Sequence, residues 1–594
     1  MTTATTKGGP AGAGGTGFVP ADLDASAFEA VSPLVAALLS RPVKTLAQFE
    51  TWLLDRSELD AACSESRANL YIAMTCDTGD KAKAEAYTAY IENVAPKLEP
   101  LKFELDERQA GLAKLYGGPM VGPGGRLEVV TRDVTADVEM FRAENVPLNT
   151  QLETLGQKYQ TLIGAMSVEF DGQERTLPQM ARYQEVTDRS VREAAWRAVA
   201  ERRLKDRGAI DEIYDKQIGL RDKVAKNAGF KDFVGYAFKE KHRFDYAPAD
   251  CFKFHEAVAK VVTPFNRRLD EKRKKQMGLT SLRPWDLGVD PKGRGPLRPF
   301  EGGRDLVTRS RKVFAKMDAR LAMMFERLGD GSNTRGPEGG ESLDLDSRKG
   351  KAPGGYQYMR DRRRQPFIFM NAAGLHRDVE TMVHEAGHAF HSMLCESEPL
   401  VHYRHSPIEF AEVASMSMEL LSMRHWGGDG SFYADAGDLA RAQRKQLEGS
   451  VSLLAWIATI DAFQHWVYSN PGHTRVEREA FWLELDRKFG GDVEWIGLDP
   501  FRRSVWHRQP HLFLHPFYYI EYGIAQLGSL QLWLMGLEKG EDAAIEAYIR
   551  GLSLGGSRPL PELFRASGLA FDFGEGMFRK VVERVERELE KLPE

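Results

Sequence analysis

One pentapeptide, His384-Glu385-Ala386-Gly387-His388, restricts the local fold more than any other part of this 594-residue chain. Its two histidines are four positions apart, so on an α-helix they lie one above the other and both imidazoles can reach a single metal ion. Glu385 then projects beside that ion, where a carboxylate can act as a general base toward water. The pattern therefore predicts a helix that carries a zinc site with an open coordination position.

The flanking sequence predicts two helices around this motif. Apolar residues recur at helical spacing across residues 375–394. A second helix is expected to begin after Ser406, with Ser406 at the N-cap and Glu409 closing a capping box. That helix offers three carboxylates as a third metal ligand: Glu409, Glu412 and Glu419. Because the cap occupies Glu409, Glu412 is the favoured ligand.

Other zinc-site patterns fit less well. A metzincin would carry glycine at position 391 and histidine at position 394, whereas this chain has His391 and Leu394. His391 follows His388 by one helical turn, but a packing or hydrogen-bonded role is favoured for it over metal binding. A purely structural zinc site would use four protein ligands and leave no open position.

Several blocks of this sequence resemble the zinc oligopeptidases, the family that includes thimet oligopeptidase and oligopeptidase F. The blocks are Asp344–Tyr356, Arg364–Asn371, His384–His391, Phe410–Ser415 and His511–Tyr522. The likeness covers roughly residues 180–590 and is closer to the oligopeptidase F branch. It implies that Glu412 joins His384 and His388 as the third ligand of one Zn²⁺, in a gluzincin-type site.

The same resemblance implies roles for the histidine- and tyrosine-rich block. Attack of water on an amide creates an oxyanion, and donors placed beside it lower the barrier by about 3–4 kcal/mol each. The family implies this role for His511 and Tyr522. Tyr519 lies one helical turn before Tyr522 and is expected to face the same way. His515 stands near the place of a further tyrosine in the thimet branch and is assigned to substrate binding, although its individual role and those of Tyr518 and Tyr519 stay open.

A glycine-containing stretch before the motif is a candidate substrate-binding segment. Gly354, Gly355 and Tyr356 precede two short apolar runs, which are expected to form strands joined by the basic turn 360–364. An edge strand can hold an extended peptide by β-augmentation, and glycine allows the peptide backbone to approach closely. A plain structural hairpin is the alternative.

Helical patterns dominate the chain, so a mainly α fold is expected. The resemblance implies two helical lobes enclosing a deep substrate channel, with a small β-sheet near the active site. The predicted divisions are a disordered tail at 1–17, an N-terminal helical region at 18–125, an oligopeptidase F-like N-terminal domain at 126–185 and a zinc peptidase catalytic domain at 186–594.

Composition limits the partners of this chain. Its formal net charge of −5 is small for 594 residues, which argues against nucleic acid and anionic membranes as partners. The four cysteines are scattered and no signal peptide is recognisable, so a cytoplasmic location is expected. Oligopeptides are the expected substrates, cut by a metalloendopeptidase. A zinc carboxypeptidase or dipeptidyl carboxypeptidase and a non-catalytic peptide-binding protein are the alternatives, and monomer and homo-oligomer remain equally open.

Overall fold

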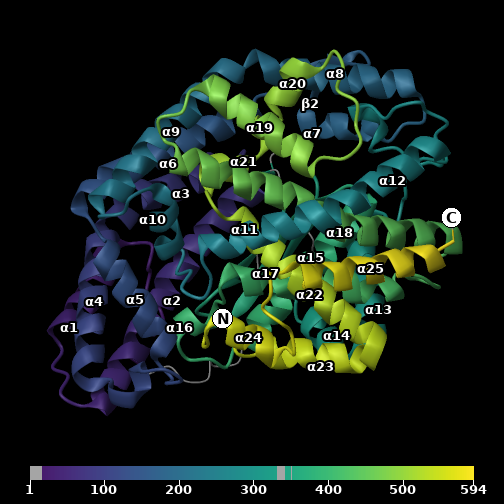
Figure 1. The fold of residues 1–594 in the computed structure, drawn as a ribbon. Coiled ribbons are helices and arrows are strands. Elements are labelled where there is room, and N and C mark those ends of the chain that lie inside the picture. Colours follow the sequence, from purple (N-terminus) through teal and green to yellow (C-terminus); the bar gives the residue numbers. More distant parts are fainter. Residues whose placement is uncertain (1–16, 331–341, 349–350, 353, 594) are drawn as a thin grey trace, which may run out of the picture. The chain divides into compact units, whose positions relative to one another are not determined.

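The computed structural model describes residues 17–330, 342–348, 351–352 and 354–593. The predicted tail therefore lies, except for Gly17, outside the described residues. Helices predominate and two small sheets accompany them, which confirms the expected mainly α fold (Figure 1). Within the described chain, the helices include none that is long and apolar enough to cross a membrane.

The chain packs into two compact units, each built from three separate segments. Unit 1 comprises residues 1–139, 299–434 and 535–570, and unit 2 comprises residues 140–298, 435–534 and 571–594. The domain boundaries expected at 125/126 and 185/186 were inferred from the sequence, and they stay a prediction.

Unit 1 begins with a helical region and continues with a sheet, the helices beside it and a short C-terminal helical pair. Its elements are α1 (Phe28–Ser40), α2 (Leu46–Cys76), α3 (Lys81–Asn93), α4 (Ala95–Tyr116), η1 (Gly118–Val121), α5 (Glu128–Met140), α13 (Gly302–Met317), α14 (Ala319–Glu326), β3 (Leu343–Asp346), β4 (Tyr356–Arg360), β5 (Gln365–Ala372), α15 (His376–Leu394), α16 (Val401–Arg404), α17 (Ile408–Ser422), η6 (Met423–His425), α23 (Glu541–Leu552) and α24 (Leu560–Ala566).

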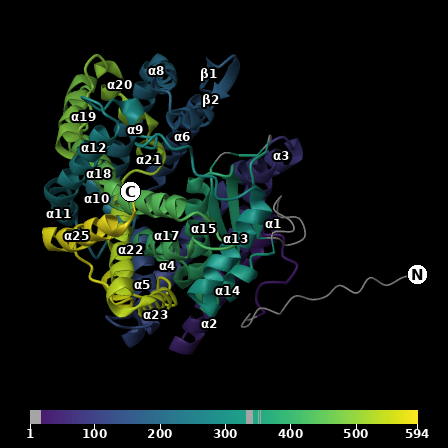
Figure 2. The same cartoon turned by 90° about the vertical axis from the view of Figure 1, so that its right-hand side faces the viewer.

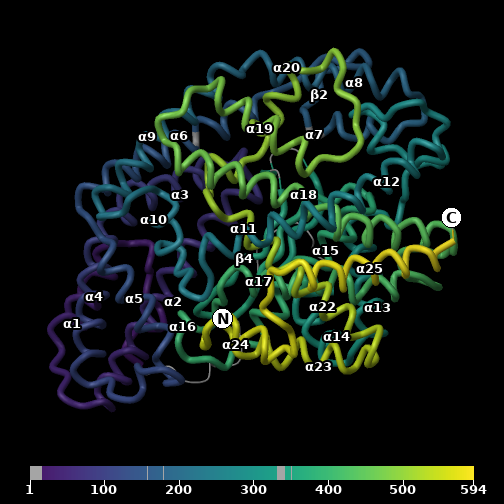
Figure 3. Tube along the Cα trace, viewed as in Figure 1, coloured from purple at the N-terminus to yellow at the C-terminus, as the bar shows by residue number. Residues whose placement is uncertain are grey.

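Long-range contacts close unit 1 around its N-terminal helices. The indole Nε1 of Trp52, buried on α2, donates to the carbonyl of Leu38 on α1 at 2.9 Å. Ser57, also on α2, donates to the carbonyl of Pro399 at 3.1 Å and accepts from the amide of Val401 at 2.6 Å. These bonds fix α16 against α2, and the trace in Figure 3 shows this meeting of distant segments.

The sheet of unit 1 has the order β3-β5-β4, with β5 parallel to β3 and antiparallel to β4. The predicted pair of strands around the basic turn is therefore confirmed. The central strand β5 buries Phe367, Ile368, Phe369 and Met370, whereas β4 lies at the edge. Helix α15 packs against both β5 and β4, so the sheet supports the helix of the HExxH motif.

Unit 2 is organised around the 34-residue helix α18. Its elements are η2 (Ala143–Asn145), α6 (Val146–Gly164), β1 (Ser167–Phe170), β2 (Gln173–Thr176), α7 (Leu177–Met180), η3 (Ala181–Gln184), α8 (Arg189–Lys205), α9 (Arg207–Asn227), α10 (Phe233–Glu240), α11 (Pro248–Ala257), the π-helical turn η4 (Val258–Val262), α12 (Thr263–Gln276), η5 (Pro284–Asp286), α18 (Ala436–Ser469), α19 (Arg475–Phe489), α20 (Asp499–Arg503), η7 (Val505–Arg508), α21 (Pro510–Leu514), α22 (Tyr519–Lys539) and α25 (Glu575–Lys591).

Helices from all three segments of unit 2 contact one another. α11, α12 and α25 all pack against α18, and α11 also packs against α25. The β1–β2 hairpin lies beside α8, as Figure 2 shows. The C-terminal helix α25 buries Phe578, Val581, Val582, Val585 and Leu589 along one stripe, which is how an amphipathic surface helix joins a core.

Candidate metal centre

Helices α15 and α17 cross closely at Gly387, the glycine of the HExxH motif. A Cβ atom at this position would lie 2.6 Å from both the Ala414 carbonyl oxygen and Ser415 Cα. The Tyr548 hydroxyl donates toward the carbonyls of Gly387 at 3.4 Å and Ala414 at 3.1 Å. Glycine therefore permits the close approach that brings carboxylates of α17 next to histidines of α15.

Three side chains meet at this crossing, and we call His384, His388 and Glu412 the metal centre. Glu412 Oε2 lies 3.5 Å from His384 Nε2 and 3.6 Å from His388 Nε2. One ligand atom from each of the three residues falls within 4.8 Å of the others. Two ligands of a tetrahedral Zn²⁺ lie about 3.4 Å apart, given zinc–ligand bonds near 2.1 Å. The side chains therefore already stand at the spacing that such an ion requires.

A second carboxylate on α17 orients one of these histidines. His384 Nδ1 lies 2.7 Å from Glu419 Oε1, so Nδ1 carries the hydrogen and Nε2 presents its lone pair toward Glu412. Glu380, one turn before His384 on α15, contacts His376 Nε2 at 3.2 Å, whereas Glu419 is the carboxylate on His384.

The charge distribution of the centre suits a cation. Burial lowers the pKa of His384, but the hydrogen bond with Glu419 and the nearby carboxylates raise it to about 10, so a positive charge is favoured there. Burial, together with the charges of His384 and His391, holds the pKa of His388 well below its usual range. Both imidazoles must be neutral to bind zinc, so an ion at this centre would take the place of the proton that the carboxylates favour on His384.

Glu385 lies beside the centre as a buried carboxylate. Burial raises its pKa to about 7, against the opposing effects of His384 and of a hydrogen bond from the backbone N–H of Gln357. Gln357 belongs to β4, so the edge strand contacts the general-base candidate directly. A carboxylate whose pKa lies near neutrality can both accept and return a proton.

The start of α17 differs from the prediction. The helix begins at Ile408 with Pro407 at the N-cap, and no side chain makes a capping bond. Ser406 was expected at the cap, but its hydroxyl lies 3.0 Å from His391 Nε2. This contact gives His391 the hydrogen-bonded, buried role that was favoured for it, and burial lowers its pKa to about 4.

The candidate substrate-binding segment leads into the edge strand. Gly354 has φ of +103°, a conformation that favours glycine, and a Cβ atom built on it would meet no atom within 4 Å. The Tyr356 hydroxyl lies 2.6 Å from Thr75 Oγ1, and its ring stacks on Phe369 at 4.7 Å. The side chain of Tyr356 is thus committed to unit 1, and the Gly354 carbonyl accepts from Asn371 Nδ2 at 2.9 Å. Only the remaining backbone groups of Gly354, Gly355 and Tyr356 are candidates for contact with a peptide.

The histidine- and tyrosine-rich block lies in unit 2, on α21 and the start of α22. The Gln509 amide Nε2 donates to His511 Nδ1 at 2.7 Å, so His511 carries its hydrogen on Nε2. Burial, and next the charge of His515, lowers the pKa of His511 to about 4. His511 is therefore a neutral donor at physiological pH. The role of Gln509 could not be predicted from the sequence, because it depends on a contact fixed by packing.

The other members of this block gather around His511. The ring centroid of His511 lies 4.9 Å from Tyr519, 5.6 Å from Tyr518, 6.0 Å from Tyr522 and 6.3 Å from His515. Burial raises the pKa of Tyr519, whose hydroxyl also receives hydrogen bonds from Trp456 and Gln509. The structure therefore brings the predicted residues of this block together and commits the Tyr519 hydroxyl to structural partners.

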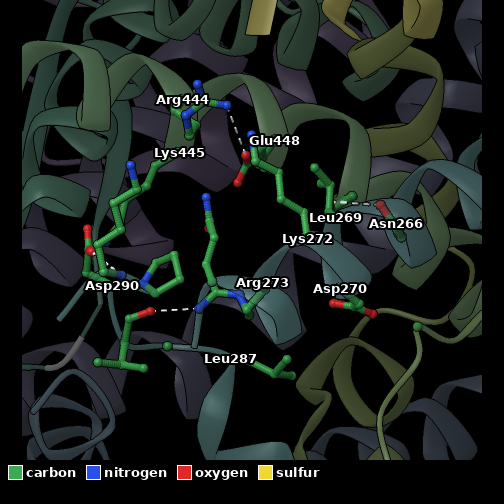
Figure 4. A pocket seen from close by; sticks show the side chains of 18 of the residues that line it. Asn266, Leu269, Asp270, Lys272, Arg273, Leu287, Asp290, Arg444, Lys445 and Glu448 are labelled. Carbon is green, nitrogen blue, oxygen red and sulfur yellow. Dashed lines mark hydrogen bonds and ion pairs between the residues drawn. The ribbon is translucent and has the colours of Figure 1, made fainter. Parts of the chain in front are cut away.

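A separate cavity of about 590 Å³ lies within unit 2, between α12, α18 and the segment 287–294 (Figure 4). Basic side chains dominate its lining: Lys272, Arg273, Lys292, Arg294, Arg441, Arg444 and Lys445. Arg444 pairs with Glu448 at 3.8 Å, and Arg273 donates to the carbonyl of Val289 at 2.7 Å. The cavity lining contains neither a histidine nor a member of the metal centre, and its carboxylates, Asp270, Asp290 and Glu448, offset part of the positive charge.

Comparison with known proteins gives consistent matches. The model of "Peptidase family M3" matches residues 182–293 and 323–583. A protein described as "Oligoendopeptidase F homolog" from Borreliella burgdorferi is 27% identical over 207 residues, and the match spans about a third of each chain, 34% in both cases. The structure titled "PZ PEPTIDASE A with inhibitor 2" has a TM-score of 0.86 at 26% identity, covering 96% of this chain and 99% of that one. A candidate oligoendopeptidase F from Bacillus anthracis shares the fold, with a TM-score of 0.80 at 24% identity over 96% of this chain and 97% of that one.

Proposed function

The chain belongs to peptidase family M3, and on that basis we propose that it is a zinc-dependent metalloendopeptidase. Its substrates would be short or unfolded oligopeptides, cut at internal peptide bonds. The observation that carries this proposal is Glu385, a buried carboxylate with a raised pKa next to three metal ligands. A metal-binding protein that turned nothing over would have no chemical use for this group.

We propose that His384, His388 and Glu412 hold one Zn²⁺. When bound, the ion supplies Lewis acidity, which activates water and polarises the scissile carbonyl. Glu419 keeps the hydrogen of His384 on Nδ1, so Nε2 stays available as a ligand. The Ser415 hydroxyl donates to Glu412 Oε2 at 2.9 Å and restrains that carboxylate.

Glu385 performs the proton transfers in this mechanism. Its carboxylate takes a proton from the attacking water and later delivers it to the nitrogen of the departing amine. The N–H of Gln357 holds the carboxylate in place through both steps. Burial raises the pKa of Glu385, which favours its return of the proton to the departing amine.

His511 and Tyr522 stabilise the oxyanion in this proposal, a role that rests on the family resemblance. The hydrogen bond from Gln509 to His511 Nδ1 supports it, because it leaves Nε2–H as a donor. Charge-stabilising donors of this kind contribute most when their positions are fixed in advance. Tyr519 has a lesser part, since its hydroxyl already has partners.

Substrate backbone would pair with the edge strand β4. A peptide added antiparallel to this strand would lie along the side of the sheet that carries Gln357, next to Glu385. Gly354 and Gly355 provide side-chain-free backbone at its start. The deep channel, the cytoplasmic location and the exclusion of nucleic acid and membranes as partners stay predictions.

A zinc carboxypeptidase or dipeptidyl carboxypeptidase is the closest alternative. Digestion of a mixed peptide library, with and without a chelator, followed by mass spectrometry distinguishes these activities. The endopeptidase proposal expects internal cuts, retained when both peptide ends are blocked and abolished by the chelator. Cleavage restricted to free carboxyl ends would replace it with the carboxypeptidase, and binding without cleavage would support the non-catalytic peptide-binding protein.

A further inference from the structure

Four side chains that can bind a metal meet inside unit 2, and they share no residue with the metal centre. Cys251 and His255 lie one turn apart on α11, and Asp461 and His465 lie one turn apart on α18. Because α11 and α18 pack against each other, the two i, i+4 pairs converge (Figure 1). We call these four residues the Cys251 cluster.

The distances within the Cys251 cluster are those of a ligand set. Ligand atoms of Cys251, Asp461 and His465 all lie within 4.8 Å of one another. His465 Nε2 stands 3.4 Å from Asp461 Oδ2, which matches the spacing of about 3.4 Å between two ligands on one tetrahedral zinc ion. His255 Nε2 lies closer, 2.8 Å from Asp461 Oδ2, and therefore hydrogen-bonds the carboxylate.

The cluster is enclosed. Asp461 has no solvent exposure, Cys251 is 1% exposed and His465 is 4% exposed. The rings of Phe252, Phe517 and Phe238 lie 5.0, 5.1 and 6.0 Å from the imidazole of His465. Arg243, whose charge acts on Cys251, is itself ion-paired with Glu521 at 2.6 Å. Polar atoms in such an apolar pocket are costly unless they find partners.

Two atoms of the cluster lack such partners. Asp461 Oδ1 and His465 Nε2 are both buried and make no hydrogen bond with any atom of the described chain. Buried polar atoms without partners are rare in native proteins, and an ion or water molecule is a common explanation. An ion held between Cys251, Asp461 and His465 would satisfy both atoms at once.

We propose that Cys251, His465 and both carboxylate oxygens of Asp461 form a second, structural zinc site with four protein ligand atoms, in which His255 orients the Asp461 carboxylate. A thiolate, a carboxylate and an imidazole together suit Zn²⁺. One divalent ion with a thiolate, a carboxylate and a neutral imidazole has zero net charge, which suits the apolar surroundings. The site joins the 251–255 segment to a helix that begins about 200 residues later in the chain, so the ion would stabilise the core of unit 2.

Metal analysis of the purified full chain tests this assignment. The proposal expects two zinc ions per chain, falling to one in Cys251→Ser and to one in His388→Ala, with none left in the double variant. Cys395→Ser is the matched control, because Cys395 is an equally buried thiol whose Sγ only donates to the Leu552 carbonyl at 3.1 Å. It should retain both ions.

If Cys251→Ser fails to fold, replacing zinc with cobalt in the wild-type protein provides a second test. The metal centre contains no sulfur, so only the Cys251 cluster can give a thiolate-to-cobalt charge-transfer band in the near ultraviolet. Wild-type protein loaded with cobalt should show this band. A single metal per chain that is lost in His388→Ala, or two-ion loading without the thiolate band, would overturn the assignment.

Discussion

The metal centre and the Cys251 cluster share one arrangement of helices but lie in different surroundings. Each draws an i, i+4 pair of ligands from one helix and a further ligand from a neighbouring helix that packs against it, which is the Glu412 carboxylate in the metal centre and the Cys251 thiol in the cluster. The side chains of His384 and His388 are 22% and 19% exposed, whereas those of Asp461 and His465 are 0% and 5% exposed. Only the metal centre therefore admits water.

The second difference is the general base. Glu385 adjoins the metal centre and belongs to its helix, while the fourth member of the Cys251 cluster, His255, is bonded to a ligand. Spacing along a helix is thus enough to assemble a metal site. Exposure and an adjacent uncommitted carboxylate separate a site for catalysis from one for stability.

Replacing the general base should have the largest effect. Glu385→Gln keeps the size and hydrogen bonding of the side chain but cannot accept a proton. We expect kcat to fall by roughly 1,000-fold, while zinc content stays at the wild-type level. Glu380→Gln is the matched control, one turn earlier on α15, and should retain activity because Glu380 contacts His376. Loss of zinc in Glu385→Gln would move Glu385 from base to ligand.

The assignment of the oxyanion donors predicts different kinetic effects for two neighbouring tyrosines. Tyr522→Phe should lower kcat by about 100-fold with little change in KM, since its hydroxyl is assigned to the transition state. Tyr519→Phe should have a smaller effect, because the Tyr519 hydroxyl is occupied by Trp456 and Gln509. Steady-state kinetics with one fluorogenic peptide measure both variants. Equal losses in the two variants would contradict the assignment.

Removing the carboxylate that hydrogen-bonds His384 should weaken metal binding without abolishing it. Glu419→Ala deletes the acceptor for His384 Nδ1, and we expect zinc affinity to fall by about 10–100-fold. Competition with a calibrated chelator measures the change. The Cys251 cluster should keep its own ion in this variant. An unchanged affinity would show that the hydrogen bond does not tune the ligand.

The rate of peptide hydrolysis should fall as the pH is lowered below neutrality. The pKa of Glu385 is raised to about 7 by burial, and a bound cation would lower it, so the acid limb should lie below that value. The carboxylate is active only when deprotonated, so kcat falls by about tenfold for each pH unit below its pKa. A pH profile of kcat, compared with that of Glu385→Gln, measures this ionisation. An identical acid limb in the variant would assign it to another group.

Two helix glycines, buried Gly387 and exposed Gly219, test the close helix crossing. Gly387→Ala places a methyl group 2.6 Å from the Ala414 carbonyl, and we expect the free energy of unfolding to fall by about 1–3 kcal/mol. Gly219→Ala, on α9, meets no atom within 4 Å and should be neutral or slightly stabilising. Chemical denaturation compares the two variants. Equal stability would argue that the crossing can relax.

Local patterns in the sequence predicted much of this molecule. The helix of the HExxH motif and the strands around the basic turn both follow from short-range patterns. The predicted cap at Ser406 was wrong, because its hydroxyl binds His391 across a loop. A side chain with two possible partners cannot be assigned from local sequence.

Long-range partners could not be predicted in the same way. Glu419 was one of three candidates, and neither Gln357 nor Gln509 carried a signal, since each acts through a contact fixed by packing. The Cys251 cluster joins two unremarkable i, i+4 pairs about 200 residues apart in the chain. Only the packing of α11 on α18 shows that these pairs belong together.

Anomalous diffraction at the zinc edge, from crystals of the zinc-loaded protein, tests the central claim most directly. The account predicts an anomalous peak bounded by His384, His388 and Glu412, with Glu385 beside it but not coordinated and with one ligand position free of protein atoms. Divergence of these three side chains from the peak, or a fourth protein atom on the ion, would contradict the catalytic role of this centre.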